Sequence, residues 1–352
     1  MMKSYDELKA EMEVIQQQMV DIDIEDLKWF LTLINIMKDN HNIKTILITG
    51  GSGMVGRNFF EHHKSKKYSI LKPSRTEMNL LNILDVNSYL SKNKPDLIIH
   101  AAARIGGIQA NIKNPVSFLC ENVDMGKNLL LSAKEQNISK IINLSSSCIY
   151  PKNMEVPLEE DFILSGLLEP TNEAYAIGKI FTLKLCSYIN KEFNDFSYKT
   201  LVPCNLFGKY DNFDLETGHL IPNIINKIHH AKLNKKNKVT IWGDGSVKRE
   251  FMYVKELIDC IYYSIEHFSQ MPEIMNVGVD KDYSVLDYYN IIAKSFEWEG
   301  SFDFDMTKPV GQKQKLVSVK KLNNFGWKSK VLLQNAINET IKHYLESYKH
   351  GL

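Results

Sequence analysis

A strand, a glycine-rich turn and a helix in direct succession constrain this chain more than any other feature. Residues 45–49 are aliphatic or β-branched, as a buried parallel strand requires. Glycines follow at Gly50, Gly51, Gly53 and Gly56, and no helix breaker comes directly after them. In this context the glycines predict a tight turn, close approach of a pyrophosphate to the helix N-terminus and close packing of helix on strand. The stretch therefore predicts a dinucleotide-binding unit.

The alternation of strand and helix continues along the chain. Apolar runs predict strands at 68–72, 96–100 and 140–144, and residues 111–137 are predicted to be mostly helical. Repeated strand–helix units of this kind predict an α/β fold, a Rossmann-type doubly wound parallel sheet that binds ligands at the carboxyl ends of its strands.

The length of the chain allows a second, smaller unit. With 352 residues, of which 44% are hydrophobic, the chain can bury a full core. We expect a dinucleotide-binding Rossmann domain at 44–205, joined by about 239–265, and a smaller α/β lobe at 206–238 and 266–352. The ligands of the two parts, NADP and a nucleotide sugar, are expected from the motifs and the resemblance described below.

Residues 1–42 precede the first strand and are expected to form a helical extension. Leu8, Met12, Ile15 and Met19 are spaced as an apolar seam on a helix. Such a helix either packs on its own domain or drives oligomerisation, and the sequence leaves both readings open.

Bulk properties exclude several classes of function. The formal net charge of +1 offers no electrostatic case for nucleic acid or an anionic membrane. The five cysteines are scattered without a C-x-x-C pair, which favours a reducing compartment over a disulfide or zinc framework. No signal-peptide pattern or membrane span is visible. We therefore expect a cytoplasmic protein with no metal, no nucleic-acid partner and no membrane partner.

The end of the second predicted strand indicates which dinucleotide binds. An NAD-specific site would place an acidic residue there for the ribose hydroxyls, whereas this chain has Ser74 and Arg75. A hydroxyl and a guanidinium suit a 2′-phosphate, so NADP is predicted. Asn79 and Leu80 follow where such enzymes contact adenine, and the small residues Ala101, Ala102 and Ala103 leave room for the cofactor at the end of the third strand.

A catalytic group is predicted at the end of the fourth strand and on the helix after it. Ser146 follows that strand, and Tyr175 and Lys179 lie four positions apart, so they share one face of a helix. A lysine ammonium beside a phenol favours the phenolate and should lower the pKa of Tyr175. The serine hydroxyl and the phenol can hold a carbonyl oxygen between them.

Several longer motifs carry a resemblance to a known family. The chain resembles the extended short-chain dehydrogenase/reductase family, and within it the GDP-L-fucose synthase branch, which epimerises and reduces GDP-4-keto-6-deoxy-mannose. The motifs are Ser-Ser-Cys-Ile-Tyr-Pro at 146–151, Glu-Pro-Thr-Asn-Glu-Ala-Tyr-Ala-Ile-Gly-Lys at 169–179, Pro-Cys-Asn-Leu-Phe-Gly at 203–208, Gly-His-Leu-Ile-Pro at 218–222, Trp-Gly-Asp-Gly at 242–245 and Arg-Glu-Phe at 249–251.

The resemblance implies a role for each catalytic residue. Ser146 and Tyr175 would hold the C4 keto oxygen, with Tyr175 donating the proton, and Lys179 would hold the nicotinamide ribose. Cys148 and His219 would be the acid–base pair for epimerisation at C3 and C5, whose C–H bonds the C4 ketone acidifies. Taken alone, Cys148 could instead be a small buried hydrophobic residue, and His219 could be an ordinary loop histidine.

The resemblance also implies the binding residues. A GDP-linked 4-keto-6-deoxy sugar would be held by Leu220, Trp242, Arg249 and Lys315, although Trp242 could instead be a core residue of a strand. A homodimer or higher homo-oligomer is implied as well. The residues expected around NADP(H) are Gly50, Gly53, Met54, Val55, Gly56, Arg75, Asn79, Leu80, Ala101, Ala102, Ala103, Tyr175, Lys179, Pro203, Asn205, Leu206 and His219.

Two alternatives stay open at this point. The enzyme could perform only the reduction or only the epimerisation, on a GDP-6-deoxy-4-keto-heptose. Alternatively, the chain could be a cofactor-binding scaffold whose N-terminal helices recruit partners, against which the intact Ser146, Tyr175 and Lys179 argue.

Overall fold

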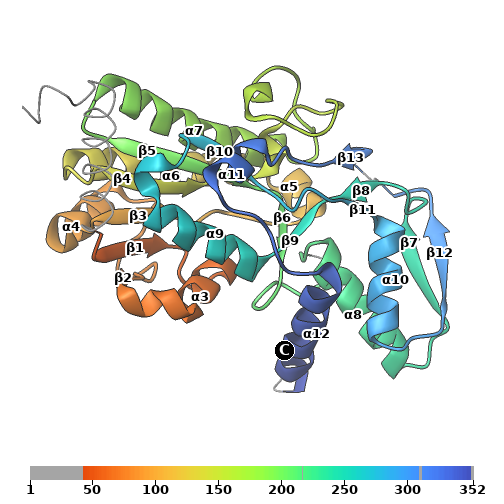
Figure 1. Cartoon of the computed structure of the whole chain (residues 1–352). Helices are drawn as coiled ribbons and strands as arrows, with labels where there is room; N and C mark the ends of the chain where they lie inside the picture. Colours follow the sequence, from red (N-terminus) through yellow and green to blue (C-terminus); the bar gives the residue numbers. More distant parts are fainter. Residues whose placement is uncertain (1–42, 216, 309–310, 350–352) are drawn as a thin grey trace, which may run out of the picture.

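A six-stranded sheet dominates the computed structural model, which describes residues 43–215, 217–308 and 311–349 (Figure 1). The strand order is β10-β5-β4-β3-β1-β2, and all neighbouring strands run parallel. The strands are β1 (Thr45–Thr49), β2 (Ser69–Leu71), β3 (Leu97–His100), β4 (Lys140–Leu144), β5 (Ser197–Pro203) and β10 (Ile274–Val277). The predicted α/β sheet is thus confirmed, while the predicted N-terminal extension at 1–42 lies outside the described residues.

Helices cover both faces of this sheet. On one face α6 contacts both α4 and α7, and on the other α3 contacts α9. Their bounds are α3 (Met54–Glu61), α4 (Ile83–Asn93), α6 (Pro115–Glu135), α7 (Glu173–Glu192) and α9 (Val254–Glu266). Strand residues such as Ile46, Ile98 and Ile142 are completely buried, because helices cover the central strands on both faces.

The region 111–137, predicted to be mostly helical, is confirmed as such. Two helices occupy this region, α5 (Ile108–Lys113) and α6, and the break falls at Asn114. Pro115 explains the break, since proline disfavours a helical residue before it and is well placed at the first position of a helix.

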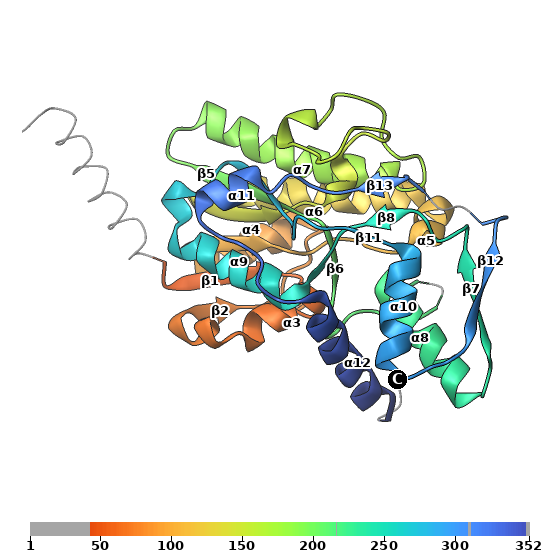
Figure 2. The same ribbon diagram turned by 45° about the vertical axis from the view of Figure 1, so that its right-hand side comes forward.

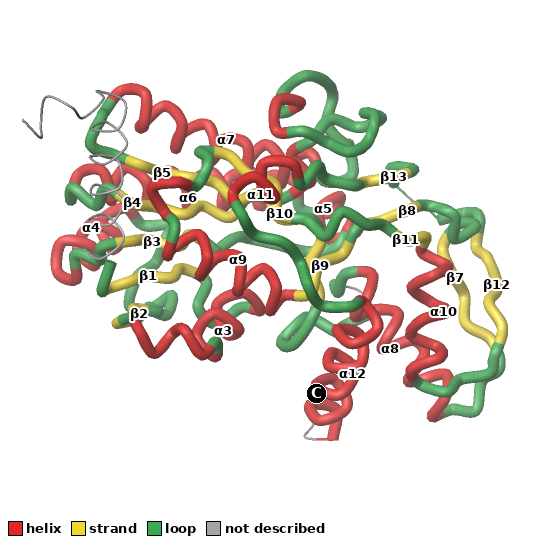
Figure 3. The backbone as a smooth tube through the Cα atoms, in the orientation of Figure 1, coloured by secondary structure: helices red, strands yellow, loops and turns green. Residues whose placement is uncertain are grey.

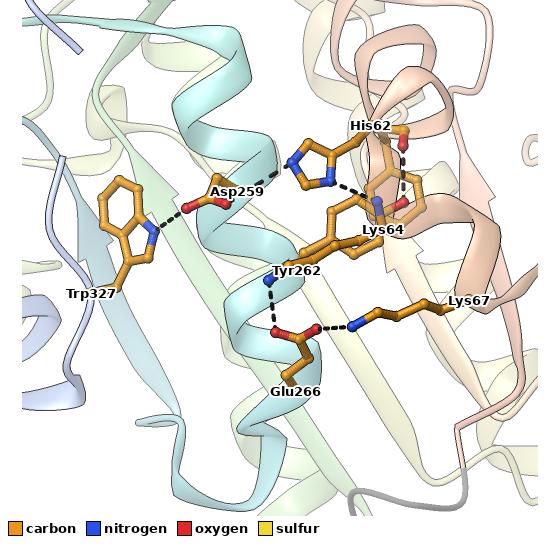
Figure 4. A network of polar contacts seen from close by, with 8 residues as sticks. His62, Lys64, Lys67, Asp259, Tyr262, Glu266 and Trp327 are labelled. Carbon is orange, nitrogen blue, oxygen red and sulfur yellow. Dashed lines mark hydrogen bonds and ion pairs between the residues drawn. The ribbon is translucent and has the colours of Figure 1, made fainter. Parts of the chain in front are cut away.

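A network of polar and aromatic contacts joins α3 and the 3-10 turn that follows it, His63–Lys67, to α9 (Figure 4). Glu266 accepts hydrogen bonds from the Nζ atoms of Lys64 at 2.7 Å and Lys67 at 3.1 Å. Asp259 accepts one from the indole of Trp327 at 2.9 Å. Between them the ring of Tyr262 stacks on Phe59, with 4.5 Å between centroids. These contacts fix the helix that follows the glycine turn.

A smaller lobe lies beside the main sheet (Figure 2). A three-stranded sheet in the order β11-β8-β13 and a parallel pair β12-β7 form its strands. They are β7 (Lys238–Trp242), β8 (Lys248–Arg249), β11 (Tyr283–Ser284), β12 (Ser301–Asp305) and β13 (Gln314–Lys315). Helices α8 (Leu220–Leu233), α10 (Val285–Ser295) and α12 (Leu333–Lys349) complete it, with α10 contacting both of the others.

The chain crosses several times between the main sheet and the lobe. Strands β6 (Asn205–Phe207) and β9 (Phe251–Tyr253) form a parallel pair of their own, and Figure 3 shows β9 between the two larger sheets. The chain also leaves β10 toward β11, and leaves β13 toward α11 (Lys320–Phe325). The carboxyl ends of β1, β3 and β4 therefore face the lobe. Among the described helices none has the length and apolar character needed to cross a membrane.

Candidate active site

The glycine turn has the geometry that a dinucleotide requires. Gly50 has a φ of +72°, and a Cβ atom there would lie 2.9 Å from the backbone of Ala102, so only glycine fits. The N–H of Gly53 bonds the carbonyl of Gly50 at 3.0 Å, and α3 begins after Gly53 without a side-chain cap. An uncapped helix N-terminus beside exposed glycine suits a pyrophosphate.

The predicted 2′-phosphate site differs in detail from expectation. Arg75 is exposed, but the backbone N–H of Ser74 bonds the carboxylate of Glu77 at 2.8 Å, and the Ser74 hydroxyl lies 2.9 Å from that of Thr76. A residue that the sequence reasoning missed lies nearby: a Cβ atom on Gly51 would come within 3.0 Å of the Cβ atom of Lys72. Arg75 and Lys72 are thus the two cations at the end of β2.

Among the other residues predicted around the cofactor, some are half-buried, whereas Leu80 is buried in the core. The backbone N–H of Ala102 bonds the Thr49 hydroxyl at 3.1 Å, which holds the end of β3 against β1. Leu80 instead points its side chain into the core, where it is 8% exposed, and its carbonyl accepts a bond from Asn128. Leu80 therefore presents little side-chain surface to a ligand. Those that pack half-buried against the main core include Met54, Val55, Ala101 and Leu206.

The segment after β4 places two reactive groups side by side. Cys148 lies in a short 3-10 turn, Ser147–Ile149, and its backbone N–H bonds the hydroxyl oxygen of Ser146 at 3.4 Å. Cys148 is buried, while Ser146 is half-buried. Tyr150 in the same motif has a structural contact, a 2.6 Å hydrogen bond to Asn276.

Tyr175 and Lys179 lie one turn apart near the start of α7, as predicted. Burial lowers the pKa of Lys179 to about 8. The predicted lowering of the Tyr175 pKa is wrong for this structure: burial, and then the neighbouring Cys148, raise the pKa of the phenol, and Lys179 does not offset them. The phenol is consequently protonated at neutral pH and is a proton donor.

The electrostatics of Cys148 link the two ends of the site. Burial raises the pKa of the Cys148 thiol, while the positive charges of Lys315 and Lys179 oppose this rise. Burial lowers the pKa of Lys315. Cys148 and Glu169 oppose this fall, while the positive charge of Arg249 adds to it. Lys315 therefore lies close enough to the reactive thiol to stabilise a thiolate.

His219 directly precedes α8. The residue before it lies against the loop after β3, since a Cβ atom on Gly107 would be 3.5 Å from the Gly218 carbonyl oxygen. The residue His219 is accessible to solvent, yet the surrounding protein displaces enough water to lower the pKa of the imidazole. A neutral imidazole at pH 7 can accept a proton.

Cations gather at the far end of the site. Arg249 of β8 and Lys315 of β13 are paired across two parallel strands. Trp242 is 41% exposed at the end of β7, so the alternative that it is a core residue is wrong. Two lysines that the sequence reasoning missed flank its ring: the Nζ atoms of Lys227 and Lys308 lie 5.8 Å and 5.7 Å from the ring centroid.

Two residues of this end could have been found in the sequence by closer reading. Lys227 lies two helical turns after His219, on the same helix. Glu169, whose charge influences both Arg249 and Lys315, lies within the motif that also carries Tyr175. By contrast, no sequence pattern joins Lys72 to the glycine turn.

Comparisons with known proteins agree with this geometry. Residues 46–278 match the model of the NAD dependent epimerase/dehydratase family. The chain is 50% identical over 300 residues to the GDP-L-colitose synthase of Yersinia pseudotuberculosis, covering 85% of this chain and 97% of that protein. It is 43% identical to the GDP-L-fucose synthase of Azorhizobium caulinodans, covering 86% and 96%. A GDP-L-fucose synthetase from Naegleria fowleri bound to NADP superposes with a TM-score of 0.78 at 26% identity, covering 87% and 94%.

Proposed function

Because the chain belongs to the NAD dependent epimerase/dehydratase family, we propose that it converts a GDP-4-keto-6-deoxy-mannose-type sugar by 3,5-epimerisation and NADPH-dependent reduction of the C4 ketone. The product would be GDP-L-fucose or a close analogue. The observation that carries this proposal is the convergence at one site of Cys148 and Tyr175 with the Arg249–Lys315 pair. The identities with synthases of GDP-L-colitose and GDP-L-fucose support the same substrate class.

NADP(H) fits the first half of the site. The Gly50 turn, the uncapped start of α3 and the small residues after β3 would hold the pyrophosphate, and Arg75 with Lys72 would hold the 2′-phosphate. Bound there, the reduced cofactor supplies the hydride for C4.

The residues at C4 would bind and protonate the keto oxygen. Ser146 and Tyr175 would each donate a hydrogen bond to this oxygen, which stabilises negative charge on it. The raised pKa of Tyr175 keeps the phenol protonated until that charge develops, so it transfers its proton in the reduction step. The same two hydrogen bonds would stabilise the enolate needed for epimerisation.

Epimerisation needs a base on one face of the sugar and an acid on the other. Cys148 and His219 come from different elements and would approach from different sides. One would remove the C–H proton, leaving its electron pair in the enolate, and the other would return a proton to the opposite face. Burial raises the pKa of Cys148, so its thiol is suited to donate a proton, and the neutral imidazole of His219 is suited to accept one. The positive charge of Lys315 would stabilise the thiolate that forms.

The nucleotide would be bound in the lobe. Arg249 and Lys315 suit the diphosphate, and the exposed ring of Trp242, flanked by Lys227 and Lys308, suits a stacked base. We also propose that β7, expected within the Rossmann domain, belongs to the lobe instead, because it pairs with β12 there. A cytoplasmic homo-oligomer is part of the same proposal.

The GDP-L-colitose synthase relative favours one variant of this function. The 50% identity to that relative makes a variant of the mannose-type substrate, such as its 3-deoxy form, an analogue to compare.

The proposal is tested by incubating the purified chain with NADPH and each of three GDP-4-keto-6-deoxy sugars: the mannose form, its 3-deoxy form and the heptose form. We expect oxidation of NADPH with at least one of them and a C5-inverted product by NMR. Absence of NADPH oxidation with all three would contradict the function. A product reduced at C4 without inversion would support the reductase-only alternative instead.

A further inference from the structure

One buried carboxylate lies where three segments cross between the main sheet and the lobe. Glu250 is 1% exposed and occupies the single position between β8 and β9. Its Oε1 atom accepts hydrogen bonds from the backbone N–H groups of Val279 at 2.6 Å and Asp280 at 3.1 Å. Its Oε2 atom accepts one from the backbone N–H of Val317 at 3.0 Å.

These partners belong to two different crossings. Val279 and Asp280 follow β10, the outermost strand of the main sheet beside β5. Val317 comes two residues after Lys315, where the chain leaves β13. Glu250 itself follows Arg249, so one side chain ties together the three segments that carry or flank the two cations.

The backbone of Glu250 extends the connection to the cofactor side. The side-chain amide of Asn205 donates a 2.8 Å hydrogen bond to the Glu250 carbonyl, and Asn205 begins the strand that pairs with β9. The polar groups of Glu250 therefore contact both halves of the site.

The crossing is packed too closely for substitution of its glycine. A Cβ atom on Gly278 would lie 2.5 Å from Oε1 of Glu250 and 2.6 Å from a methyl group of Val317. Such a contact would force the carboxylate or the Val317 segment to move. Gly278 thus provides a way to disturb this arrangement without removing the carboxylate.

The position is costly for an acidic group. Burial raises the pKa of Glu250 to about 7, and the three backbone N–H bonds oppose this rise. A buried carboxylate contributes little net stability compared with apolar packing, but loss of an accepting oxygen leaves N–H groups unpaired. Its main consequence is therefore geometric, because the three donors fix the segments relative to one another.

We propose that Glu250 is a positioning residue that holds Arg249 and Lys315 in the arrangement that binds the substrate diphosphate. Its carboxylate acts through the two cations, whereas the contact with Asn205 on the cofactor side is made by the backbone carbonyl, which substitution of the side chain leaves in place. The inference depends on the proposed function, since it assigns the diphosphate to this pair.

The test compares Glu250→Gln with a matched control, Glu256→Gln. The glutamine can accept at one oxygen only, so at least one of the three N–H groups loses its partner. Glu256 is likewise buried and accepts from backbone N–H groups, including that of Val331 at 2.9 Å, but it ties α9 to the segment before α12. We expect Glu250→Gln to raise the Kd for GDP by calorimetry, and the KM for the GDP sugar, by about tenfold.

Two further readouts separate positioning from general destabilisation. The KM for NADPH should change by less than about twofold in Glu250→Gln, and Glu256→Gln should lower the thermal midpoint without raising the Kd for GDP. Should Glu250→Gln fail to fold, Gly278→Ala retains the carboxylate and should raise the Kd for GDP while NADPH binding persists.

Three results would contradict the inference or the function on which it depends. Unchanged GDP affinity in both Glu250→Gln and Gly278→Ala would overturn the inference, as would an equal loss of GDP affinity in Glu256→Gln. A wild-type chain that binds no GDP would contradict the proposed function itself, a failure distinct from the other two.

Discussion

The two ends of the site are built in different ways. At the chemical end, Ser146 and Cys148 follow a single strand and Tyr175 and Lys179 share one helical turn, so each pair is placed by local structure. At the nucleotide end, Arg249 and Lys315 are distant in the sequence and meet only because β8 pairs with β13. Those two strands are two residues long each, and a buried carboxylate on the adjoining crossing helps to hold them.

This difference predicts how each end responds to substitution. Groups placed by a buried strand end or a helical turn should tolerate distant changes, and their removal should affect the rate of chemistry. Groups placed by short strands and shared hydrogen bonds should depend on their neighbours, and their removal should affect substrate affinity. The four substitutions below test this contrast, beginning with the largest expected effect.

Tyr175→Phe should reduce NADPH oxidation the most. It removes the proton donor to the C4 oxygen, and general acid catalysis contributes about 10²–10⁴-fold to rate. GDP binding should stay within about twofold, because the nucleotide end is separate. Activity within tenfold of the wild type would place the proton donor elsewhere.

Cys148→Ser should slow epimerisation by about 10²-fold while reduction persists. A serine hydroxyl is a far weaker proton donor than a thiol whose thiolate the nearby charge of Lys315 stabilises. Exchange of sugar C–H protons with deuterated solvent measures the first step, and NADPH oxidation with an already inverted substrate measures the second. An equal loss of both activities would mean that the two steps do not use divided residues.

Arg249→Ala should act mainly on affinity. Loss of charge-assisted hydrogen bonds to a diphosphate corresponds to about 1.5–3 kcal/mol, so the KM for the GDP sugar should rise about 10- to 100-fold. The kcat value should change much less. Arg249→Lys keeps the charge but loses the planar fork, so its KM should lie between those of the wild type and Arg249→Ala. A fall in kcat with unchanged KM would remove the distinction between the two ends.

Lys179→Met should give the smallest of these effects, a pH-dependent change in the free energy of unfolding of the cofactor-free protein. Burial lowers the pKa of Lys179 to about 8, so the folded chain holds this ammonium at a cost at neutral pH. As pH rises above 8, the folded state loses the proton before the unfolded state does, and wild-type stability should increase relative to the variant. Denaturant unfolding should show the advantage of Lys179→Met shrinking by about 1 kcal/mol between pH 7 and 9. A constant difference would contradict the lowered pKa.

The same contrast explains how much the sequence could predict. The α/β sheet, the glycine turn and the pairing of Tyr175 with Lys179 depend on local patterns, and the structure places them as expected. Arg249, Lys315 and Trp242 could be suggested only by resemblance to a family, because long-range pairing brings them into the site.

Features that depend on burial or on contacts between distant segments could not be predicted from the sequence. The raised pKa of Tyr175 depends on burial, which a helical spacing does not reveal. Lys72 lies beside the glycine turn only because β2 pairs with β1. The carboxylate of Glu250 takes its meaning from partners on two other segments.

The central claim is that both ends serve one site that inverts and reduces the same sugar. A single incubation with NADPH and GDP-4-keto-6-deoxy-mannose in deuterium oxide, followed by NMR of the product, tests it most directly. The account predicts deuterium at C3 and C5 of a C4-reduced product, with one NADPH oxidised for each molecule formed. A C4-reduced product that retains both original protons, or exchange without oxidation of NADPH, would contradict it.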